Sequence, residues 1–278
     1  MAEVLDIHTH PPTPSWLRAA GGAYLRSAEA YFRRSFEPVG LEGMVKQYEA
    51  WGIDRAVLLG WDATLGNGLP AVPNDEVVAA VRDYPSFFVG FAGVDPRRGK
   101  AVEELQRCAR LGLRGAKLHP SAMDLRPDDA ACGPFWRACE DLGLVVMVHT
   151  GTTGWGAGGP GGHGVRLEPS RPLWLDNVAA RFPRVRLIAA HAGWPWHEEL
   201  LAIALHKANV YVDVSGWVPK YLPQAVWDYA NGPLKHKVLF GSDYPLVEPP
   251  RIVEGLREVL KPEVLPLVLG ANAAALLA

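Results

Sequence analysis

Short apolar segments rich in valine, leucine and isoleucine recur along the whole chain, and each is followed by a glycine, proline or polar break and then by a helix-like stretch. Short uninterrupted apolar runs are typical of strands that are buried on both faces of a parallel sheet. We expect eight strands, at Val4–Ile7, Ala56–Leu59, Phe88–Gly93, Gly115–Leu118, Val145–Val148, Arg186–Ala190, Val210–Val214 and Val238–Phe240. Helices are expected between them at Leu41–Trp51, Asn74–Asp83, Lys100–Leu111, Phe135–Leu142, Trp174–Arg181 and Ile252–Leu260.

Eight consecutive strand–helix units favour a closed (β/α)8 TIM barrel, because an open sheet would need a reversal of strand order. Such a barrel typically takes about 250 residues, and the chain has 278. Nothing between the units has the composition of an inter-domain linker. Residues 1–278 are therefore expected to form a single α/β domain.

Two connections are too long to be simple turns. Residues 11–40 follow the first strand, and residues 150–172, which are rich in glycine, follow the fifth. Loops of this length inside a compact domain are usually functional or disordered, and the loops after barrel strands form the face that carries active sites. We expect both to be long loops that set substrate specificity, and the glycine-rich one to be a mobile lid.

Five of the nine histidines fall at or just beyond the end of a predicted strand, and Asp243 does the same after the eighth. Side chains alternate along a strand, so residues two apart, such as Lys117 and His119, point the same way. Imidazoles and a carboxylate at one barrel mouth suit a divalent ion such as zinc, although other first-row metals are possible. A lone histidine would more often be a hydrogen-bonded core residue, but this coincidence of positions favours a metal site. The five histidines are His8, His10, His119, His149 and His191.

Composition and charge narrow the range of partners. The formal net charge of −2 gives no indication of nucleic-acid or membrane binding, so a small-molecule partner is expected. No apolar run approaches the ~20 residues of a membrane-spanning helix, and the N-terminus does not resemble a secretion signal. We therefore expect a cytoplasmic protein. Its three cysteines, which have no metal-binding spacing, are expected to be reduced core residues.

Six motifs follow one another along nearly the whole chain: DIHTHP, GAKLHP, VMVHTG, AAHAGWPW, LFGSDYP and LGANAAALL. In this order they resemble the amidohydrolase superfamily, in particular its amidohydrolase-2 branch of aminocarboxymuconate-semialdehyde decarboxylase-like enzymes and related hydrolases. The resemblance implies one divalent metal ion, zinc with manganese as an alternative, bound by His8, His10, His149 and Asp243. It also implies that His191 is catalytic, with His191 or Asp243 accepting a proton from metal-activated water.

Further residues are expected to bind the substrate. In binuclear amidohydrolases the lysine of the fourth strand is carboxylated, whereas in the branch resembled here it is usually unmodified, so Lys117 is expected to bind a carboxylate or carbonyl oxygen. A buried ion pair is the alternative for Lys117. His119 is expected in the same pocket, and Trp155 and Trp194 are expected to line a cleft for a flat or cyclic substrate, although aromatic residues also pack between loops.

Three functions are compatible with these residues. We expect a metal-dependent hydrolase of a small ester, lactone or amide, because the decarboxylases that the chain resembles generally need an arginine to orient the carboxylate, and none can be placed in the barrel mouth. The alternative is a metal-dependent, non-oxidative decarboxylase of an aromatic or unsaturated acid. A binding protein that keeps the barrel without catalysis is disfavoured by the full set of ligands. The resemblance also implies a homodimer.

Overall fold

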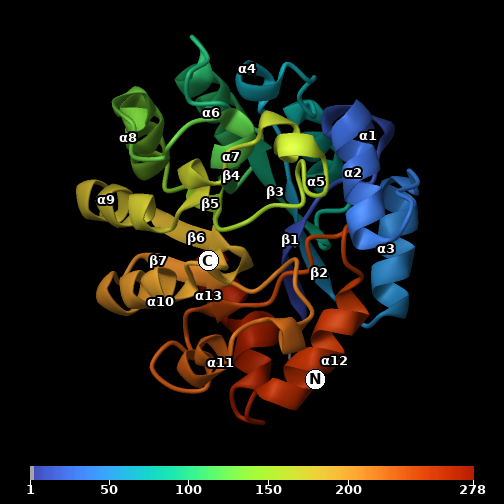
Figure 1. Ribbon diagram of the computed structural model, residues 1–278, viewed down its shortest axis with the longest axis vertical. Helices are drawn as coiled ribbons and strands as arrows, with labels where there is room; N and C mark the ends of the chain where they lie inside the picture. The colour runs from blue at the N-terminus through green and yellow to red at the C-terminus, as the bar shows by residue number, and fades with distance from the viewer. Residues whose placement is uncertain (1–2) are drawn as a thin grey trace.

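Eight parallel strands form a barrel in the computed structural model, which describes residues 3–278 (Figure 1). Neighbours in the sheet follow the chain from β1 to β8 without a reversal of strand order. The predicted TIM barrel is confirmed, and each predicted strand is present with ends that differ by at most two residues. The strands are β1 Leu5–Thr9, β2 Arg55–Leu59, β3 Phe88–Gly93, β4 Gly115–Leu118, β5 Val145–His149, β6 Arg186–Ala190, β7 Val210–Asp213 and β8 Val238–Leu239.

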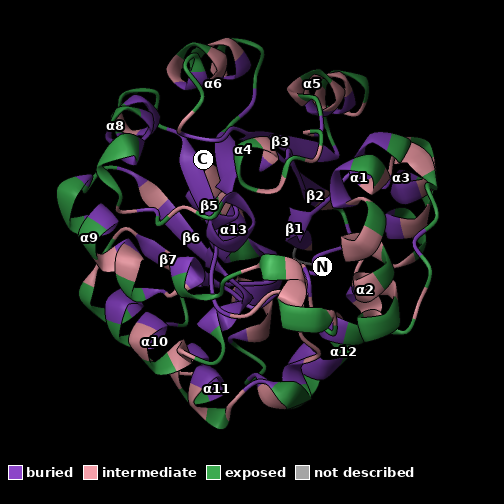
Figure 2. Ribbon diagram, turned by 45° about the horizontal axis from the view of Figure 1, so that its top comes forward, coloured by how far each residue is buried: buried purple, intermediate pink, exposed green. Residues whose placement is uncertain are grey.

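Helices surround the barrel, with their exposed faces turned outward (Figure 2). All six helices named from the sequence are confirmed, as α3, α5, α6, α8, α9 and α12. No described helix is long and apolar enough to cross a membrane. The helices are α1 Pro14–Ala20, α2 Gly22–Phe32, α3 Gly40–Ala50, α4 Thr64–Asn67, α5 Asn74–Asp83, α6 Ala101–Arg110, α7 Pro120–Met123, α8 Gly133–Asp141, α9 Leu173–Arg181, α10 His197–His206, α11 Gln224–Ala230, α12 Pro249–Val259 and α13 Asn272–Leu277.

Backbone hydrogen bonds between β1 and the chain around and after β8 close the barrel. The amide of Ile7 donates to the carbonyl of Phe240 at 3.0 Å, and the amide of Asp243 donates to the carbonyl of His8 at 2.8 Å. The amide of His10 then donates to the carbonyl of Tyr244 at 2.7 Å. The first strand and the segment that follows the last are thereby held side by side at the barrel mouth.

An irregularity in β1 changes the direction of its side chains. Asp6 pairs with Ala56, whereas Thr9 pairs with Leu58, so three steps along β1 match two steps along β2. Such a β-bulge inserts one extra residue and re-aims the side chains that follow. Strict alternation from the interior residues Leu5 and Ile7 would turn His8 and His10 toward the helices, and the bulge turns them toward the barrel mouth.

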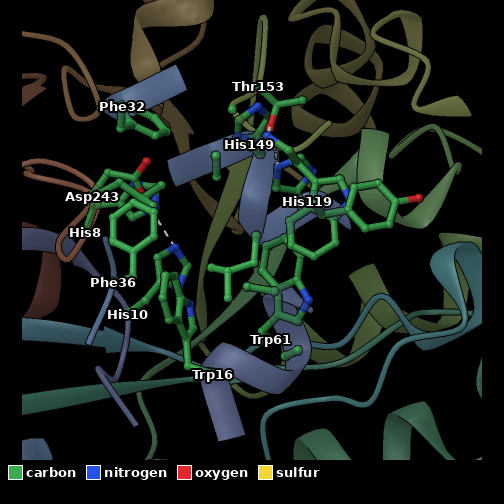
Figure 3. Close-up of a pocket in the computed structure, with 18 of the residues that line it drawn as sticks. His8, His10, Trp16, Phe32, Phe36, Trp61, His119, His149, Thr153 and Asp243 are labelled. Carbon is green, nitrogen blue, oxygen red and sulfur yellow. Dashed lines mark hydrogen bonds and ion pairs between the residues drawn. The ribbon is translucent and has the colours of Figure 1, made fainter. Parts of the chain in front are cut away.

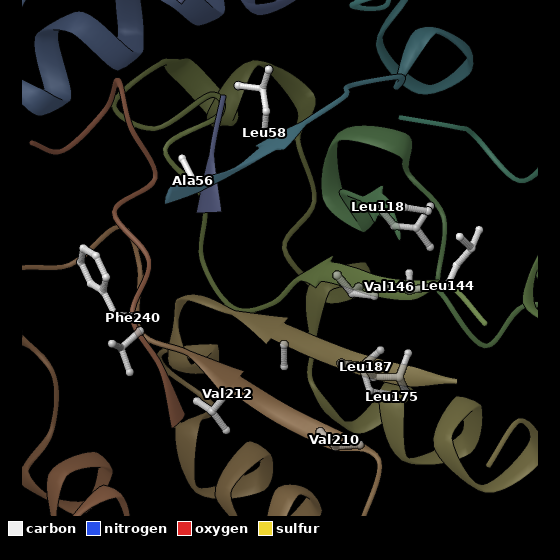
Figure 4. Packing of buried hydrophobic residues seen from close by; sticks show 14 of the residues in the cluster. Ala56, Leu58, Leu118, Leu144, Val146, Leu175, Leu187, Val210, Val212 and Phe240 are labelled. Atoms are coloured by element: carbon white, nitrogen blue, oxygen red, sulfur yellow. The ribbon is translucent and has the colours of Figure 1, made fainter. Parts of the chain in front are cut away.

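Apolar side chains form two clusters, one on each side of the strands. One cluster lies inside the barrel and includes Ile7, Leu59 and Phe91. The other lies between strands and helices, where Leu187 of β6 and Leu175 of α9 belong to the same cluster (Figure 4). Each strand is therefore buried on both faces, as its apolar sequence predicts. The three cysteines are free and buried, which confirms the expected core positions.

Residues 11–40 do not form the long loop that we expected. They contain α1 and α2, which lie beside α3 at one side of the barrel (Figure 1). The Thr13 side chain accepts a hydrogen bond from the amide of Trp16, and Pro14 occupies the first position of α1. A capping threonine followed by proline is a signal for the start of a helix, and the sequence contains it here.

Residues 150–172 form an irregular segment with short 3-10 turns, as a loop prediction requires. Arg166 forms an ion pair with Asp124, and Arg171 forms one with Glu199. The ring of His163 is hydrogen-bonded to Ser27 of α2 at 2.8 Å. These contacts tie the segment to its surroundings, and its action as a mobile lid stays a prediction.

The backbones at the ends of β2 and β3 approach each other so closely that only glycine fits. A methyl group added at Gly93 would lie 2.2 Å from the amide nitrogen of Trp61, and one added at Gly60 would lie 2.3 Å from the amide nitrogen of Gly93. Gly93 also pairs with Lys117 in the neighbouring strand. This contact therefore sets the position of residues at the barrel mouth.

Replacing Gly93 with alanine should destabilise the protein, because two backbone segments would have to separate. We expect the free energy of unfolding to fall by about 1–3 kcal/mol, the usual cost of overpacking a close-packed site. Urea unfolding followed by circular dichroism measures the change. Gly99→Ala is the matched control, since a methyl group there meets open space. Equal midpoints for the two variants would contradict the assignment.

Candidate metal centre and active site

Polar side chains from five strand ends line one small cavity of about 80 Å³ at the barrel mouth, which we call the inner chamber (Figure 3). They come from the ends of β1, β4, β5 and β6 and from the segment after β8. The structure therefore brings together almost all of the site residues that the sequence predicts. These residues are His8, His10, Lys117, His119, His149, His191 and Asp243.

Three of the four predicted metal ligands converge. The Nε2 atoms of His8 and His10 each lie 3.3 Å from Oδ1 of Asp243, and one ligand atom from each of the three residues lies within 4.8 Å of the others. His149 stands beside this group without belonging to it. Its Nε2 donates to the carbonyl of Thr152 at 3.1 Å, so the lone pair of the neutral ring is on Nδ1.

A buried carboxylate fixes the orientation of the His8 ring. Its Nδ1 donates to Oδ2 of Asp213 at 2.7 Å, which leaves the lone pair on Nε2 facing Asp243. The ammonium of Lys117 donates to that Nε2 at 3.1 Å. Carboxylate–histidine pairs of this kind orient metal ligands in many proteins.

The group formed by His8, His10 and Asp243 fits a single divalent cation. Burial lowers the pKa of both histidines, that of His8 well below its ordinary value, so both rings are neutral and have lone pairs to share. Nδ1 of His10 is buried and has no hydrogen-bond partner among residues 3–278. Two neutral imidazoles and one carboxylate are a donor set that zinc and manganese accept.

His191 and Asp243 both adopt the left-handed backbone conformation, with φ of 65° and 66°. Non-glycine residues in this region are uncommon and cluster at functional sites. Nδ1 of His191 donates to the carbonyl of Ser215 at 3.1 Å, so its Nε2 carries the lone pair. Burial lowers the pKa of His191 to about 4, and the ring is therefore a neutral proton acceptor near pH 7.

Lys117 and His119 differ in how fully the protein uses their hydrogen-bonding groups. Burial lowers the pKa of Lys117 to about 8, while the charges of Asp243 and Asp213 act in the opposite sense. Nδ1 of His119 accepts from the amide of Ala122 at 3.1 Å and thereby caps α7. Its Nε2 lies 3.2 Å from the hydroxyl of Thr153. Both nitrogens of His119 are thus engaged by the protein, whereas the Lys117 ammonium donates one hydrogen bond to His8 and has further N–H groups at the chamber.

Aromatic side chains complete the inner chamber, and several come from the unexpected helices α1 and α2. Trp155 of the glycine-rich segment stacks on Tyr24 of α2, with ring centroids 4.7 Å apart. Trp194 is 37 % exposed and is not among the described residues that line the inner chamber. It lies beside Trp217, with ring centroids 5.3 Å apart. The aromatic lining consists of Trp16, Tyr24, Phe32, Phe36, Trp61 and Trp155.

A second and wider cavity of about 620 Å³ adjoins the chamber, and we call it the outer cleft. His149, His191 and Asp243 line both spaces. Three arginines that sequence reasoning missed also line the outer cleft: Arg33 and Arg34 after α2, and Arg251 in the first turn of α12. Arg34 lies 3.5 Å from the carboxylate of Glu248.

Sequence reasoning also missed two buried carboxylates behind the chamber. Asp6 accepts from the amide of Ser242 at 2.9 Å and from the hydroxyl of Tyr48 at 3.0 Å, and Asp213 holds His8. Burial raises the pKa of both carboxyl groups to about 7. A signal for Asp213 was present, because it is the next-to-last residue of a predicted strand and Ser215 lies two residues further on, the same spacing as His8 and His10.

Known proteins share this fold and parts of this sequence. A curated relative, 2-amino-3-carboxymuconate-6-semialdehyde decarboxylase of Dictyostelium discoideum, is 23% identical over 223 residues, a match that covers 66% of this chain and 60% of the relative. An uncharacterised TIM-barrel protein of Bordetella bronchiseptica is 27% identical with a TM-score of 0.83, and the match covers 99% of this chain and 98% of that one.

A further solved structure is that of a dihydroxybenzoic acid decarboxylase of a Polaromonas species with bound manganese and the inhibitor 2-nitroresorcinol. It is 18% identical with a TM-score of 0.72, and the match covers 100% of this chain and 97% of that one. The Amidohydro_2 family model, described as amidohydrolase, matches residues 5–278. Since that match spans almost the whole barrel and every strand end at its mouth, the chain belongs to the amidohydrolase family, in its amidohydrolase-2 branch.

Proposed function

We propose that the protein is a metal-dependent decarboxylase that removes carbon dioxide from a flat, unsaturated or aromatic carboxylic acid. The observation that carries this proposal is the lining of the inner chamber, where aromatic rings surround Lys117 and the group of His8, His10 and Asp243. An apolar enclosure removes a carboxylate from water, and this raises its free energy more than that of the dispersed charge in the transition state. The names of two relatives, both decarboxylases, support the same reaction.

One divalent ion would be held by His8, His10 and Asp243, with His149 as the fourth ligand expected from the sequence. When bound, the ion supplies positive charge that holds a substrate oxygen and stabilises negative charge in the transition state. Manganese in the Polaromonas decarboxylase supports a first-row metal. We propose zinc or manganese.

The side chains around the ion have separate tasks. The ammonium of Lys117, buried and directed at the same group, binds a carboxylate or carbonyl oxygen of the substrate. Loss of carbon dioxide leaves the electron pair of the broken bond on the substrate, and that carbon then takes up a proton. Solvent water is the source of this proton; Nε2 of His191 accepts it from water and then donates it to the substrate carbon, because Nδ1 is committed to the Ser215 carbonyl.

The outer cleft changes the balance between decarboxylation and hydrolysis. Hydrolysis was expected because no arginine could be placed in the barrel mouth, but Arg33, Arg34 and Arg251 line the cleft that adjoins the chamber. Cationic side chains in a cleft attract anionic substrates. Glu248 lines the same cleft and is paired with Arg34, so Arg33 and Arg251 are the cations that support an acid as the substrate.

Hydrolysis of a small ester, lactone or amide is the second candidate. It is favoured by the neutral Nε2 of His191, which lines both cavities and is able to accept a proton from attacking water.

The cytoplasmic location and the homodimer expected from the sequence stay predictions, as do the substrate-binding roles of His119, Trp155 and Trp194.

Assays with manganese- and zinc-loaded protein should separate the two reactions. We expect carbon dioxide to be released from one or more aromatic or unsaturated acids, and a chelator to abolish the release. Lactones and esters serve as the comparison panel. Ring opening or ester cleavage without carbon dioxide would establish hydrolysis instead, and stoichiometric metal without turnover of any compound would count against both.

Metal content should depend on the converging ligands. Purified wild-type protein is expected to contain about one equivalent of divalent metal per chain, and His8→Ala or Asp243→Ala should lower the content because each removes a ligand. Elemental analysis measures it. His206→Ala, at the exposed end of α10, is the matched control and should leave it unchanged. Two equivalents together with a carboxylated Lys117 would rule out the single-ion site.

His191→Asn should separate catalysis from metal binding. The variant is expected to retain its metal while kcat falls by about 10²-fold or more, the range for loss of a general acid or base. Parallel elemental and kinetic measurements on one preparation decide the question. A proportional loss of metal and activity would identify His191 as a ligand.

A further inference from the structure

The hydroxyl of Ser215 lies among three polar groups that come from different strands. Its Oγ is 2.6 Å from Oδ2 of Asp213, 2.9 Å from Nδ1 of His8 and 3.1 Å from Nδ1 of His191. Asp213 and Ser215 are both fully buried. Neither is among the described residues that line the inner chamber or the outer cleft. They therefore act on the site through the two histidines.

The chemistry of these atoms fixes the direction of each hydrogen bond. In its ionised form Asp213 only accepts, so His8 Nδ1 and Ser215 Oγ then both donate to Oδ2 of Asp213. The other oxygen of Asp213 accepts from the amide of Ser215 at 2.8 Å. A carbonyl also only accepts, so Nδ1 of His191 donates to Ser215. Both imidazoles consequently carry their proton on Nδ1 and present the lone pair of Nε2.

The barrel leaves room for this connection at one position. β8 pairs with β7, and backbone hydrogen bonds hold β1 beside the chain that follows β8; Gly241 lies two residues after the end of β8. A methyl group at Gly241 would lie 2.4 Å from Oδ1 of Asp213 and 2.9 Å from Cβ of both His8 and Ser215. Because Gly241 has no side chain, the residues on either side of β8 meet across it.

A second glycine permits the close approach to His191. Gly216 has a φ of 75°, and a methyl group there would lie 2.7 Å from Nδ1 of His191 and 3.4 Å from Oδ2 of Asp243. The backbone after Ser215 thus packs directly against the ring. The link from His191 through Ser215 to His8 spans the consecutive strands from β6 to β1.

We propose that Asp213 and Ser215 are positioning residues that fix the ring orientation and the protonated nitrogen of both His8 and His191. One short segment at the end of β7 then fixes the orientation of two rings, that of a metal ligand and that of the proton-transferring histidine. This inference rests on the metal centre of the proposed function, but it is independent of which reaction that centre catalyses.

Metal affinity tests the effect on His8. Asp213→Asn keeps the size of the side chain and removes its charge, and it should weaken zinc binding, measured by competition with a chromophoric chelator, by about 10- to 100-fold. Ser215→Ala, a milder change, should weaken it by about 2- to 10-fold, as expected for loss of one neutral hydrogen bond. Asp95→Asn, at a buried aspartate paired with Arg97, is the control for general destabilisation and should retain wild-type affinity. Unchanged affinity in both test variants would overturn the proposal.

Ring protonation tests the proposal without metal or turnover. Nitrogen-15 NMR of metal-free protein, with signals assigned by single histidine substitutions, distinguishes a proton on Nδ1 from one on Nε2. Both His8 and His191 should be protonated on Nδ1 in the wild type, and the Nε2-protonated form of His8 should become populated in Asp213→Asn. Wild-type rings protonated on Nε2 would overturn the inference. Failure of wild-type protein to bind zinc would instead overturn the proposed function, while this NMR result would still test the positioning residues.

Discussion

The hydrogen bonds that join β1 to the chain after β8 serve two structural purposes at once. They close the barrel, and they place the backbone of Asp243 directly against that of His8. The converging imidazoles and carboxylate therefore do not depend on a flexible loop, because their strands are held together by the same contacts that complete the sheet. A site built on strand ends is set more firmly than one built on loops. Gly241 belongs to this arrangement, since the absence of a side chain there lets groups from β7 and β1 meet.

Burial of charge is the second constraint on the barrel mouth. Carboxylates and imidazoles that lose water are costly unless they are paired, and here each buried carboxylate has several donors. Asp6 accepts from the amides of His8 and Ser242 and from the hydroxyl of Tyr48, while Asp213 accepts from His8 and twice from Ser215. The result is a rigid polar layer between the apolar interior of the barrel and the chamber. Rigidity of this kind lowers the reorganisation needed when a substrate reacts.

Most of the fold could be predicted from the sequence, because strands buried on both faces leave a clear apolar pattern and turns separate them. The residues at the mouth could also be predicted, since parallel strands end on one side. The missing parts depend on tertiary structure. Apolar periodicity did not reveal α1 and α2, whose apolar side chains line the chamber as well as packing against the main core, and Arg33 and Arg34 were missed with them. Trp194 follows a strand end, yet it is not among the described residues that line the inner chamber or the outer cleft, which its position in the sequence does not show. Asp213 and Ser215 matter only through partners on other strands.

The β-bulge in the first strand has a consequence for how relatives of this protein are interpreted. The strand reaches the mouth with its histidines facing inward only because it contains one more residue than its neighbour requires between Asp6 and Thr9. Loss of a single codon in this stretch would restore regular pairing while leaving most of the motif in place. A strand shortened by one residue would then lose the metal centre although no ligand is substituted. Among homologous genes, the presence of the two histidines is therefore weaker evidence of an intact centre than their distance from the start of the strand.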